Sequence, residues 1–180
     1  RLRPITENVP KPMLHVGARP VLETIIGQLM RYGFRRFFIS VNYMADVIMD
    51  YFGDGAAFGA EIRYLREQEP LGTAGALSLI NKKITQPLIV INGDVLNLIN
   101  FTSLLAFHDE KGSIATMCVR DSEFHVPFGI VNIEDDKIVK ITEKPSQKHF
   151  INAGVYVLDQ GALDHLETGC RVDMTDLFNK

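Results

Sequence analysis

The stretch that decides the fold is Pro87-Leu88-Ile89-Val90-Ile91-Asn92-Gly93-Asp94. Its continuous apolar run is typical of a strand covered on both faces, as in a parallel sheet between helices. Ligands of open α/β sheets bind beyond the carboxyl ends of strands. We therefore expect Asp94 to hold a hard cation such as Mg²⁺, which prefers carboxylate oxygens, and Gly93 to let the backbone approach a ligand. Taken alone, Asn-Gly-Asp is more often a turn that ends a strand.

Helical and extended patterns alternate on either side of this strand up to about residue 111, which favours a doubly wound, mainly parallel sheet with helices on both faces. After that point strands separated by turns predominate, and Asp135-Asp136 is the clearest turn. Residues 1–19 are predicted to be an ordered loop. The expected strands are 36–41, 61–65, 87–92, 114–120, 129–133, 138–143 and 151–158. The expected helices are 20–32, 45–52, 73–80, 101–110, 160–166 and 174–178.

Composition excludes several classes of function. A net charge of −3 gives no bulk attraction to nucleic acid or to acidic membranes. Cys118 and Cys170 lack a CxxC spacing, which favours a reducing cytoplasm. No apolar run approaches the ~20 residues that cross a bilayer. We therefore expect a cytoplasmic protein with neither nucleic-acid nor membrane partners. The histidines show no metal-ligand spacing, and Asp173 and Asp176 read as the acidic surface of a short helix.

Further short motifs stand before and after the central strand. Arginine offers a bidentate fork to phosphate and lysine a mobile point charge, whereas glutamine can both donate to and accept from a base edge. Each motif also has a bland interpretation, such as solvated surface charge, a capped loop or a strand bulge. The motifs are Arg1-Leu2-Arg3-Pro4, Lys11-Pro12-Met13, Gln68 with Leu71-Gly72-Thr73-Ala74-Gly75, Phe128-Gly129, Glu143-Lys144-Pro145 and Asn152-Ala153-Gly154.

In this order and at this spacing, the motifs resemble those of the sugar-phosphate nucleotidyltransferases, which join a sugar 1-phosphate to a nucleoside triphosphate (NTP). The resemblance implies an enzyme with a Rossmann-like α/β fold of the nucleotide-diphospho-sugar transferase type. It also implies one domain over residues 1–180, with a nucleotide half of about 1–111 and a sugar half of about 112–180. Mg²⁺ is the implied cofactor, and an NTP and a sugar 1-phosphate are the implied partners. A homo-oligomer or a fused further domain is left open.

The resemblance also assigns roles to residues of this sequence. Arg1 would contact the leaving pyrophosphate, Lys11 the α-phosphate region, and Asp94 the Mg²⁺ ion. The nucleotide-binding residues would be Gln68, Gly72, Thr73 and Gly93, of which Gln68 and Gly72 recognise the base. The sugar-phosphate-binding residues would be Gly129, Glu143, Lys144, Asn152 and Gly154. Many members have Tyr-Gly where this chain has Phe128-Gly129, so a contact through the tyrosine hydroxyl is lost here.

The family carries a G-G-x-G-T loop ahead of the R-L-R-P motif and a second metal-binding aspartate beyond the equivalent of Lys180, and neither occurs in this sequence. We therefore expect this chain by itself to be catalytically weak. The Val41-Asn42-Tyr43 motif, together with the stretch 51–55, resembles guanylyl- and mannose-1-phosphate-type members most. GTP is thus the favoured NTP, with thymidylyl and uridylyl transfer left open. Such products feed polysaccharide and glycan synthesis.

Two rival hypotheses remain. The same fold could serve as a non-catalytic domain that binds a sugar nucleotide for regulation. Retention of Lys11, Asp94 and Lys144 argues against that role, because a scaffold has no need of all three. A generic dinucleotide-binding Rossmann domain is the weaker rival, since no G-x-G-x-x-G follows any predicted strand.

Overall fold

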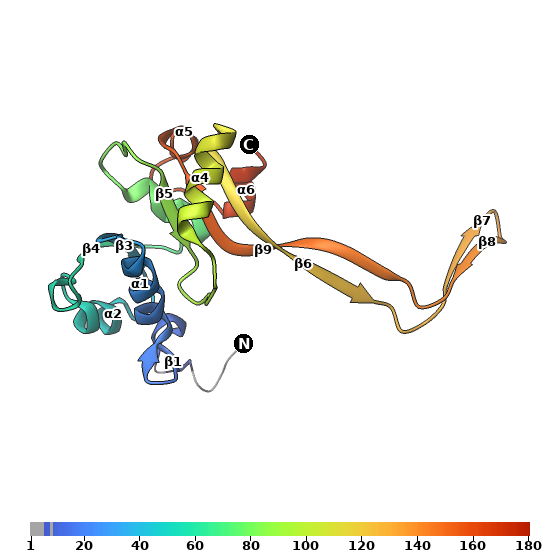
Figure 1. Cartoon of the computed structure of the whole chain (residues 1–180), viewed down its shortest axis with the longest axis horizontal. Helices are drawn as coiled ribbons and strands as arrows, with labels where there is room; N and C mark the ends of the chain where they lie inside the picture. Colours follow the sequence, from blue (N-terminus) through green and yellow to red (C-terminus); the bar gives the residue numbers. More distant parts are fainter. Residues whose placement is uncertain (1–5, 8) are drawn as a thin grey trace. The chain divides into compact units, whose positions relative to one another are not determined.

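The computed structural model describes residues 6, 7 and 9–180. These residues form two compact units (Figure 1). The first contains the described residues up to Thr116 together with Val155–Lys180, and the second contains Met117–Gly154. The chain thus leaves the first unit once and returns to it.

A two-stranded parallel sheet organises the N-terminal part of the first unit. Strand β3 (Arg36–Val41) pairs in register with β4 (Glu61–Arg66). Helices α1 (Val21–Arg31) and α2 (Ala45–Phe52) pack against this pair (Figure 1). The shared core is apolar and consists of Met13, Leu22, Ile26, Ile39, Val41, Ala45, Ile48, Phe52 and Ile62. The predictions for both strands and both helices are confirmed.

The third predicted strand of the first half has a different partner from the one that we expected. Strand β5 (Leu88–Ile91) pairs antiparallel with β9 (Ser146–Leu158), with Leu88 opposite Leu158 and Ile91 opposite Val155. Strand β9 lies between β5 and β6 (Ala115–His125). The prediction of a mainly parallel sheet is therefore wrong for the described residues, whose sheets are small and mostly antiparallel. The reason is that β9 ends in a fully buried apolar run that takes the place beside β5.

Short helices complete the first unit, and several differ in extent from the prediction. The helix expected over 73–80 is a single turn, α3 (Gly72–Gly75), followed by a 3₁₀ segment, η3 (Ala76–Leu79). The expected loop before residue 20 contains a 3₁₀ turn and a small hairpin. The remaining elements are η1 (Lys11–Met13), β1 (His15–Val16), β2 (Arg19–Pro20), η2 (Ala56–Phe58), α4 (Phe101–Lys111), α5 (Gln160–Leu163) and α6 (Met174–Phe178).

Helix α4 is anchored by its first residue. Phe101 is fully buried, and its ring meets those of Tyr32 and Phe34 edge-on, with ring centroids 5.3 and 6.5 Å apart. Asn100 caps the helix, because its Oδ1 accepts from the backbone N of Ser103 at 3.1 Å. The loop that follows Asp94 is thereby tied to α1 and its C-terminal turn.

The second unit consists of paired strands with few buried side chains. Its hairpin joins β7 (Ile130–Glu134) to β8 (Lys137–Thr142) through the two-residue turn Asp135-Asp136. Both turn residues have positive φ, 45° and 60°, as a type I′ hairpin turn requires. The turn prediction is confirmed.

No helix within the described part of the chain has the length and apolar character to span a membrane.

Candidate functional site

The predicted metal-binding aspartate lies in a tight turn at the carboxyl end of β5. Val95 N donates to Asn92 O at 3.1 Å, so Gly93 and Asp94 occupy the two central positions of the turn. Asp94 is exposed, and no described residue bonds its carboxylate. A Cβ added to Gly93 would lie 3.4 Å from Pro12 Cγ, so the side chain of Pro12 rests against this turn.

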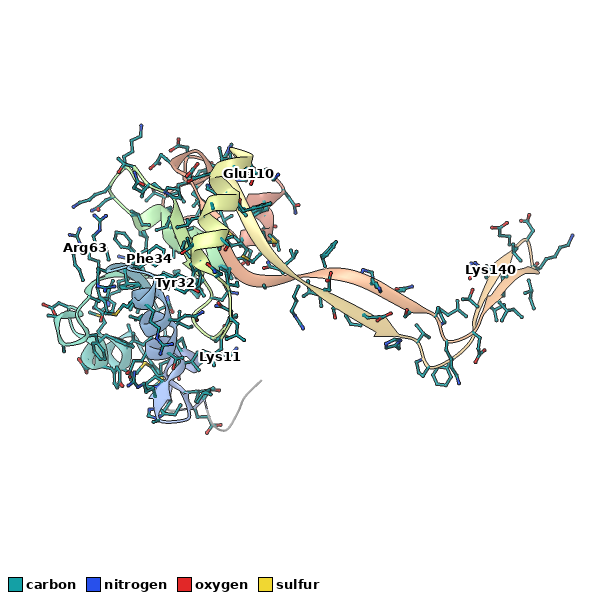
Figure 2. All side chains as sticks on the ribbon, viewed as in Figure 1. Lys11, Tyr32, Phe34, Arg63, Glu110 and Lys140 are labelled. Atoms are coloured by element: carbon teal, nitrogen blue, oxygen red, sulfur yellow. The ribbon has the colours of Figure 1, made fainter. Side chains whose placement is uncertain are left out.

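That contact brings the segment containing Lys11 to the end of β5. Pro10 and Pro12 flank Lys11, and Met13 N donates to Pro10 O at 2.8 Å. The side chain of Met13 is buried in the hydrophobic core and anchors the segment there. Lys11 itself is exposed (Figure 2). It lines a cavity of about 640 Å³ together with Glu7 and Tyr43.

Arg1, the other predicted phosphate-binding cation, lies outside the described residues, as does Arg3. Their predicted roles therefore stay predictions. The roles assigned to Lys11 and Asp94 also stay predictions. Pro12, next to Lys11, contacts Gly93, next to Asp94, so the two segments that carry these residues lie side by side.

Of the two predicted base-recognition residues, Gln68 lies on the loop between β4 and α3, and Gly72 is the first residue of α3. Gln68 is exposed, and no described residue bonds its side chain. Gly72 has φ +78°, and a Cβ there would meet Val172 O at 2.6 Å. A glycine is required at position 72 for backbone conformation and for space, quite apart from any ligand.

Residues 170–174 run directly across the Gly72-Thr73-Ala74-Gly75 turn. Ala74 N and Gly75 N both donate to Val172 O at 3.0 Å, and Val172 N donates to Leu71 O at 2.9 Å. A Cβ at Gly75 would lie 2.5 Å from Cys170 O. The glycines of this motif therefore permit close backbone packing within the first unit.

Thr73 takes part in the same crossing. Its backbone N donates to Asp173 Oδ1 at 3.0 Å, and its hydroxyl accepts from Met174 N at 2.7 Å. The hydroxyl can also donate to Asp173 Oδ1 at 3.4 Å. The Thr73 side chain thus has a structural role, and its predicted part in nucleotide binding stays a prediction.

Three of the predicted sugar-phosphate residues meet at the base of the hairpin in the second unit. A Cβ on Gly129 would lie 3.0 Å from Glu143 Oε2, which places the carboxylate against the glycine backbone. Val126 N donates to Pro145 O at 3.0 Å and closes the base of the hairpin. Between Glu143 and Pro145, Lys144 adopts a left-handed conformation with φ 42°.

Asn152 and Gly154 stand together within β9. Asn152 Oδ1 accepts from Gly154 N at 2.8 Å, and Gly154 has φ +70°. This local turn is typical of a bulge in an otherwise regular strand. The structure therefore gives both residues a backbone role, and their predicted contact with a sugar stays a prediction.

The end of β5 carries one carboxylate of the kind that Mg²⁺ uses as a ligand. Among the described side chains, no group of three or more His, Cys, Asp or Glu residues is arranged to hold a metal. Mg²⁺ bound to substrate phosphates needs only one or two carboxylates, with water completing its shell. The exposed, unbonded carboxylate of Asp94 provides such a ligand.

Among the described residues, three groups have a pKa shifted from its ordinary value, and each of the three lies outside the predicted site. Burial raises the pKa of Tyr64, and the nearby Asp54 carboxylate adds to the effect. The hydrogen bond from the Tyr51 hydroxyl to Glu23 raises the pKa of Tyr51. Burial raises the pKa of the Cys118 thiol.

Sequence reasoning missed two carboxylates beside the predicted base-recognition loop. Asp173 reads as acidic surface in the sequence, yet its carboxylate accepts from Thr73 N. Glu67 drew no interpretation, although its carboxylate accepts from Leu71 N at 2.8 Å. An aspartate just before the apolar positions of α6 is a helix-cap signal, but nothing in a single sequence indicates its partner 100 residues away.

Comparison with known proteins adds independent findings. The family model described as Nucleotidyl transferase matches residues 1–176. A UTP–glucose-1-phosphate uridylyltransferase of Synechocystis sp. is 33% identical, over all of this chain and 52% of its own length. A probable mannose-1-phosphate guanylyltransferase of Oryza sativa subsp. japonica is 35% identical, over 93% of this chain and 49% of its own. The chain thus spans about half the length of these curated relatives.

A solved structure matches as well. The crystal structure of HddC from Yersinia pseudotuberculosis has a TM-score of 0.71 and 26% sequence identity, over 94% of this chain and 76% of that one. The described α/β architecture is therefore similar to that of a known protein across nearly the whole chain.

Proposed function

The chain belongs to the nucleotidyl transferase family, and on that premise we propose that it forms the core of a sugar-1-phosphate nucleotidyltransferase. The observation that carries this proposal is the contact of Pro12 with Gly93, which joins the Lys11 segment to the Asp94 turn at the end of β5. A cation and a carboxylate at the carboxyl end of a strand suit a metal-bound triphosphate.

In the proposed reaction, an oxygen of the sugar 1-phosphate attacks the α-phosphorus of the NTP. The bond from that phosphorus to the bridging oxygen breaks, pyrophosphate leaves with the electron pair, and an NDP-sugar forms. The substrate itself is the nucleophile, so the protein's part is to position and neutralise charge. Lys11 and Arg1 would bind phosphate oxygens, and Asp94 would hold Mg²⁺, which supplies charge neutralisation at the phosphates.

We assign the remaining predicted residues to the two substrates. Gln68, Gly72, Thr73 and Gly93 would bind the nucleotide, and Gly129, Glu143, Lys144, Asn152 and Gly154 the sugar phosphate. The proximity of Gly129 to the Glu143 carboxylate supports a shared sugar contact, because a carboxylate and a neighbouring backbone group can both bond sugar hydroxyls. Residues 1–180 would then act as one nucleotidyltransferase domain.

GTP is our favoured NTP. The Val41-Asn42-Tyr43 motif supports this choice, as does the similarity to mannose-1-phosphate guanylyltransferases. The similarity to a UTP–glucose-1-phosphate uridylyltransferase makes UTP the competitor to test.

The test is pyrophosphate release by the gene product at its full length. GTP, UTP, ATP, CTP and dTTP are each combined with mannose, glucose and amino-sugar 1-phosphates in the presence of Mg²⁺. We expect release with one pair, and Asp94→Asn should lower kcat by at least about 100-fold, as loss of a charge-stabilising group in a transition state does. Asp135→Asn, in the hairpin turn, is the matched control and should leave the rate unchanged.

Two results would oppose the proposal. Pyrophosphate release at the same rate in Asp94→Asn as in wild type would show that Asp94 is not the metal ligand. No release from any pair, with NDP-sugars still bound, would favour the non-catalytic regulatory domain instead.

A further inference from the structure

Glu67 precedes the predicted base-recognition loop, residues 68–72, and its side chain bonds to the far part of that loop. One oxygen of its carboxylate accepts from Leu71 N at 2.8 Å, and the other accepts from the Ser40 hydroxyl at the end of β3. The backbone of Glu67 is bonded too, since its N donates to Val41 O at 2.9 Å and its O accepts from Asn42 Nδ2 at 3.1 Å. Glu67 therefore fixes the start of the loop to the parallel strands.

Asp173 holds the other end of the loop. Its carboxylate accepts from Thr73 N, the first residue after Gly72, while the Thr73 hydroxyl accepts from Met174 N. Each segment thus caps the first turn of the other, α3 by Asp173 and α6 by Thr73. Backbone hydrogen bonds from Val172 to Leu71, Ala74 and Gly75 hold the two segments side by side.

Between these two anchors Leu71 is buried and its O accepts from Val172 N, whereas residues 68–70 are exposed. Gln68 is exposed and no described residue bonds its side chain, so its direction follows from the backbone alone. A binding group on a loop is only as well placed as the residues that hold the loop. If the anchors loosen, only part of the population presents the loop correctly, and the apparent dissociation constant becomes the intrinsic value divided by that fraction.

We propose that Glu67 and Asp173 are positioning residues that hold the loop 68–72 for nucleotide-base discrimination. The inference rests on the proposed function, because it presumes that this loop faces the base. Neither carboxylate needs to touch the nucleotide: Glu67 acts through Leu71 and Ser40, and Asp173 acts through Thr73. Their loss should therefore change selectivity between bases while the sugar-phosphate half of the reaction stays as it was.

The experiment measures dissociation constants of GTP and UTP with Mg²⁺ by calorimetry on the full-length gene product, without a sugar phosphate and hence without turnover. Asp173→Ala and Glu67→Ala should weaken the preferred NTP about three- to tenfold, the usual effect of losing one capping bond. The ratio between the two affinities should move toward one. Asp173→Asn should fall between wild type and Asp173→Ala, since its amide oxygen still accepts from Thr73 N.

Asp176→Ala is the matched control. Asp176 is an exposed carboxylate in the same short helix, and no described residue bonds its side chain. This variant should bind both NTPs as wild type does. In the pyrophosphate assay, the KM for the sugar 1-phosphate should stay within about twofold in all variants.

Several outcomes would overturn the inference. Unchanged affinities in Asp173→Ala and Glu67→Ala would overturn it, as would an equal loss of NTP and sugar-phosphate binding with a lowered melting temperature. Should Asp173→Ala fail to fold, Glu67→Ala and Asp173→Asn carry the same comparison. A wild-type protein that discriminates bases but releases no pyrophosphate would refute the proposed function only, and one that binds no nucleotide would refute both.

Discussion

Replacing Gly75 with alanine tests whether the glycine-rich turn serves backbone packing. Gly75 has helical φ and ψ of −59° and −30°, so alanine suits its conformation. Its added Cβ, however, would lie 2.5 Å from Cys170 O, against an ordinary contact of 3.4 Å or more. The segment 170–173 must therefore retreat by about 0.9 Å, the difference between these two distances.

A retreat of that size breaks hydrogen bonds. The bonds from Ala74 N and Gly75 N to Val172 O are 3.0 Å long and would pass beyond bonding distance. Losing the two costs about 1–3 kcal/mol, and the alternative of keeping them with a strained contact costs about as much. Alanine returns up to about 1 kcal/mol through its better helix propensity. The expected net loss is about 1–2 kcal/mol of unfolding free energy.

Thermal unfolding of the full-length protein measures this loss as a fall in melting temperature of about 2–8 °C. Gly27→Ala is the matched control, because Gly27 lies in the middle of α1 and nothing is within 4 Å of its added Cβ. That variant should gain about 0.5–1 kcal/mol. Equal shifts of the same sign in the two variants would refute the packing explanation, as would a stabilised Gly75→Ala.

Two further predictions concern groups with raised pKa. Since the folded-state pKa of Tyr64 lies above its unfolded value, the stability that its neutral form contributes is complete below about pH 10 and falls as pH rises through the folded pKa. Denaturant unfolding of Tyr64→Phe should show a smaller loss of stability at alkaline pH. At pH 7 this variant should have an unfolding free energy about 1 kcal/mol lower, because it lacks the 2.6 Å hydrogen bond from the Tyr64 hydroxyl to Gly53 O. An unchanged dependence of stability on pH would contradict the prediction. Because burial raises the pKa of Cys118, iodoacetamide at pH 8 should alkylate it several-fold more slowly than the exposed Cys170, and mass spectrometry showing the reverse order would oppose the described burial.

Local structure could be predicted from the sequence because neighbouring residues determine it. The strand over 36–41, the helix over 45–52 and the Asp135-Asp136 turn follow from periodicity and turn chemistry. The partner of β5 could not be predicted in this way. Alternating strands and helices favour parallel neighbours, but here a buried run from the far end of the chain, Val155–Leu158, takes the position beside β5.

The candidate site shows the same division. A turn that ends the strand was the bland interpretation of Asn92-Gly93-Asp94, and the structure has that turn; the cation-binding role of Asp94 stays a prediction. The Gly72-Thr73-Ala74-Gly75 motif was interpreted as a ligand-binding loop or as a loop capped by Thr73 itself, whereas its glycines and threonine meet residues 170–174. One sequence carries no signal that links two segments so far apart, so the roles of Glu67 and Asp173 required coordinates.

The return of the chain to the first unit sets an order for its biosynthesis. A ribosome completes Thr73 100 residues before it adds Asp173, an interval of about 5–20 s at roughly 5–20 residues per second. During that time the apolar strand β5 and the glycine turn have emerged without the segments that cover them. The nascent chain therefore exposes these apolar surfaces until Val155–Lys180 has been synthesised, and this later segment completes the first unit.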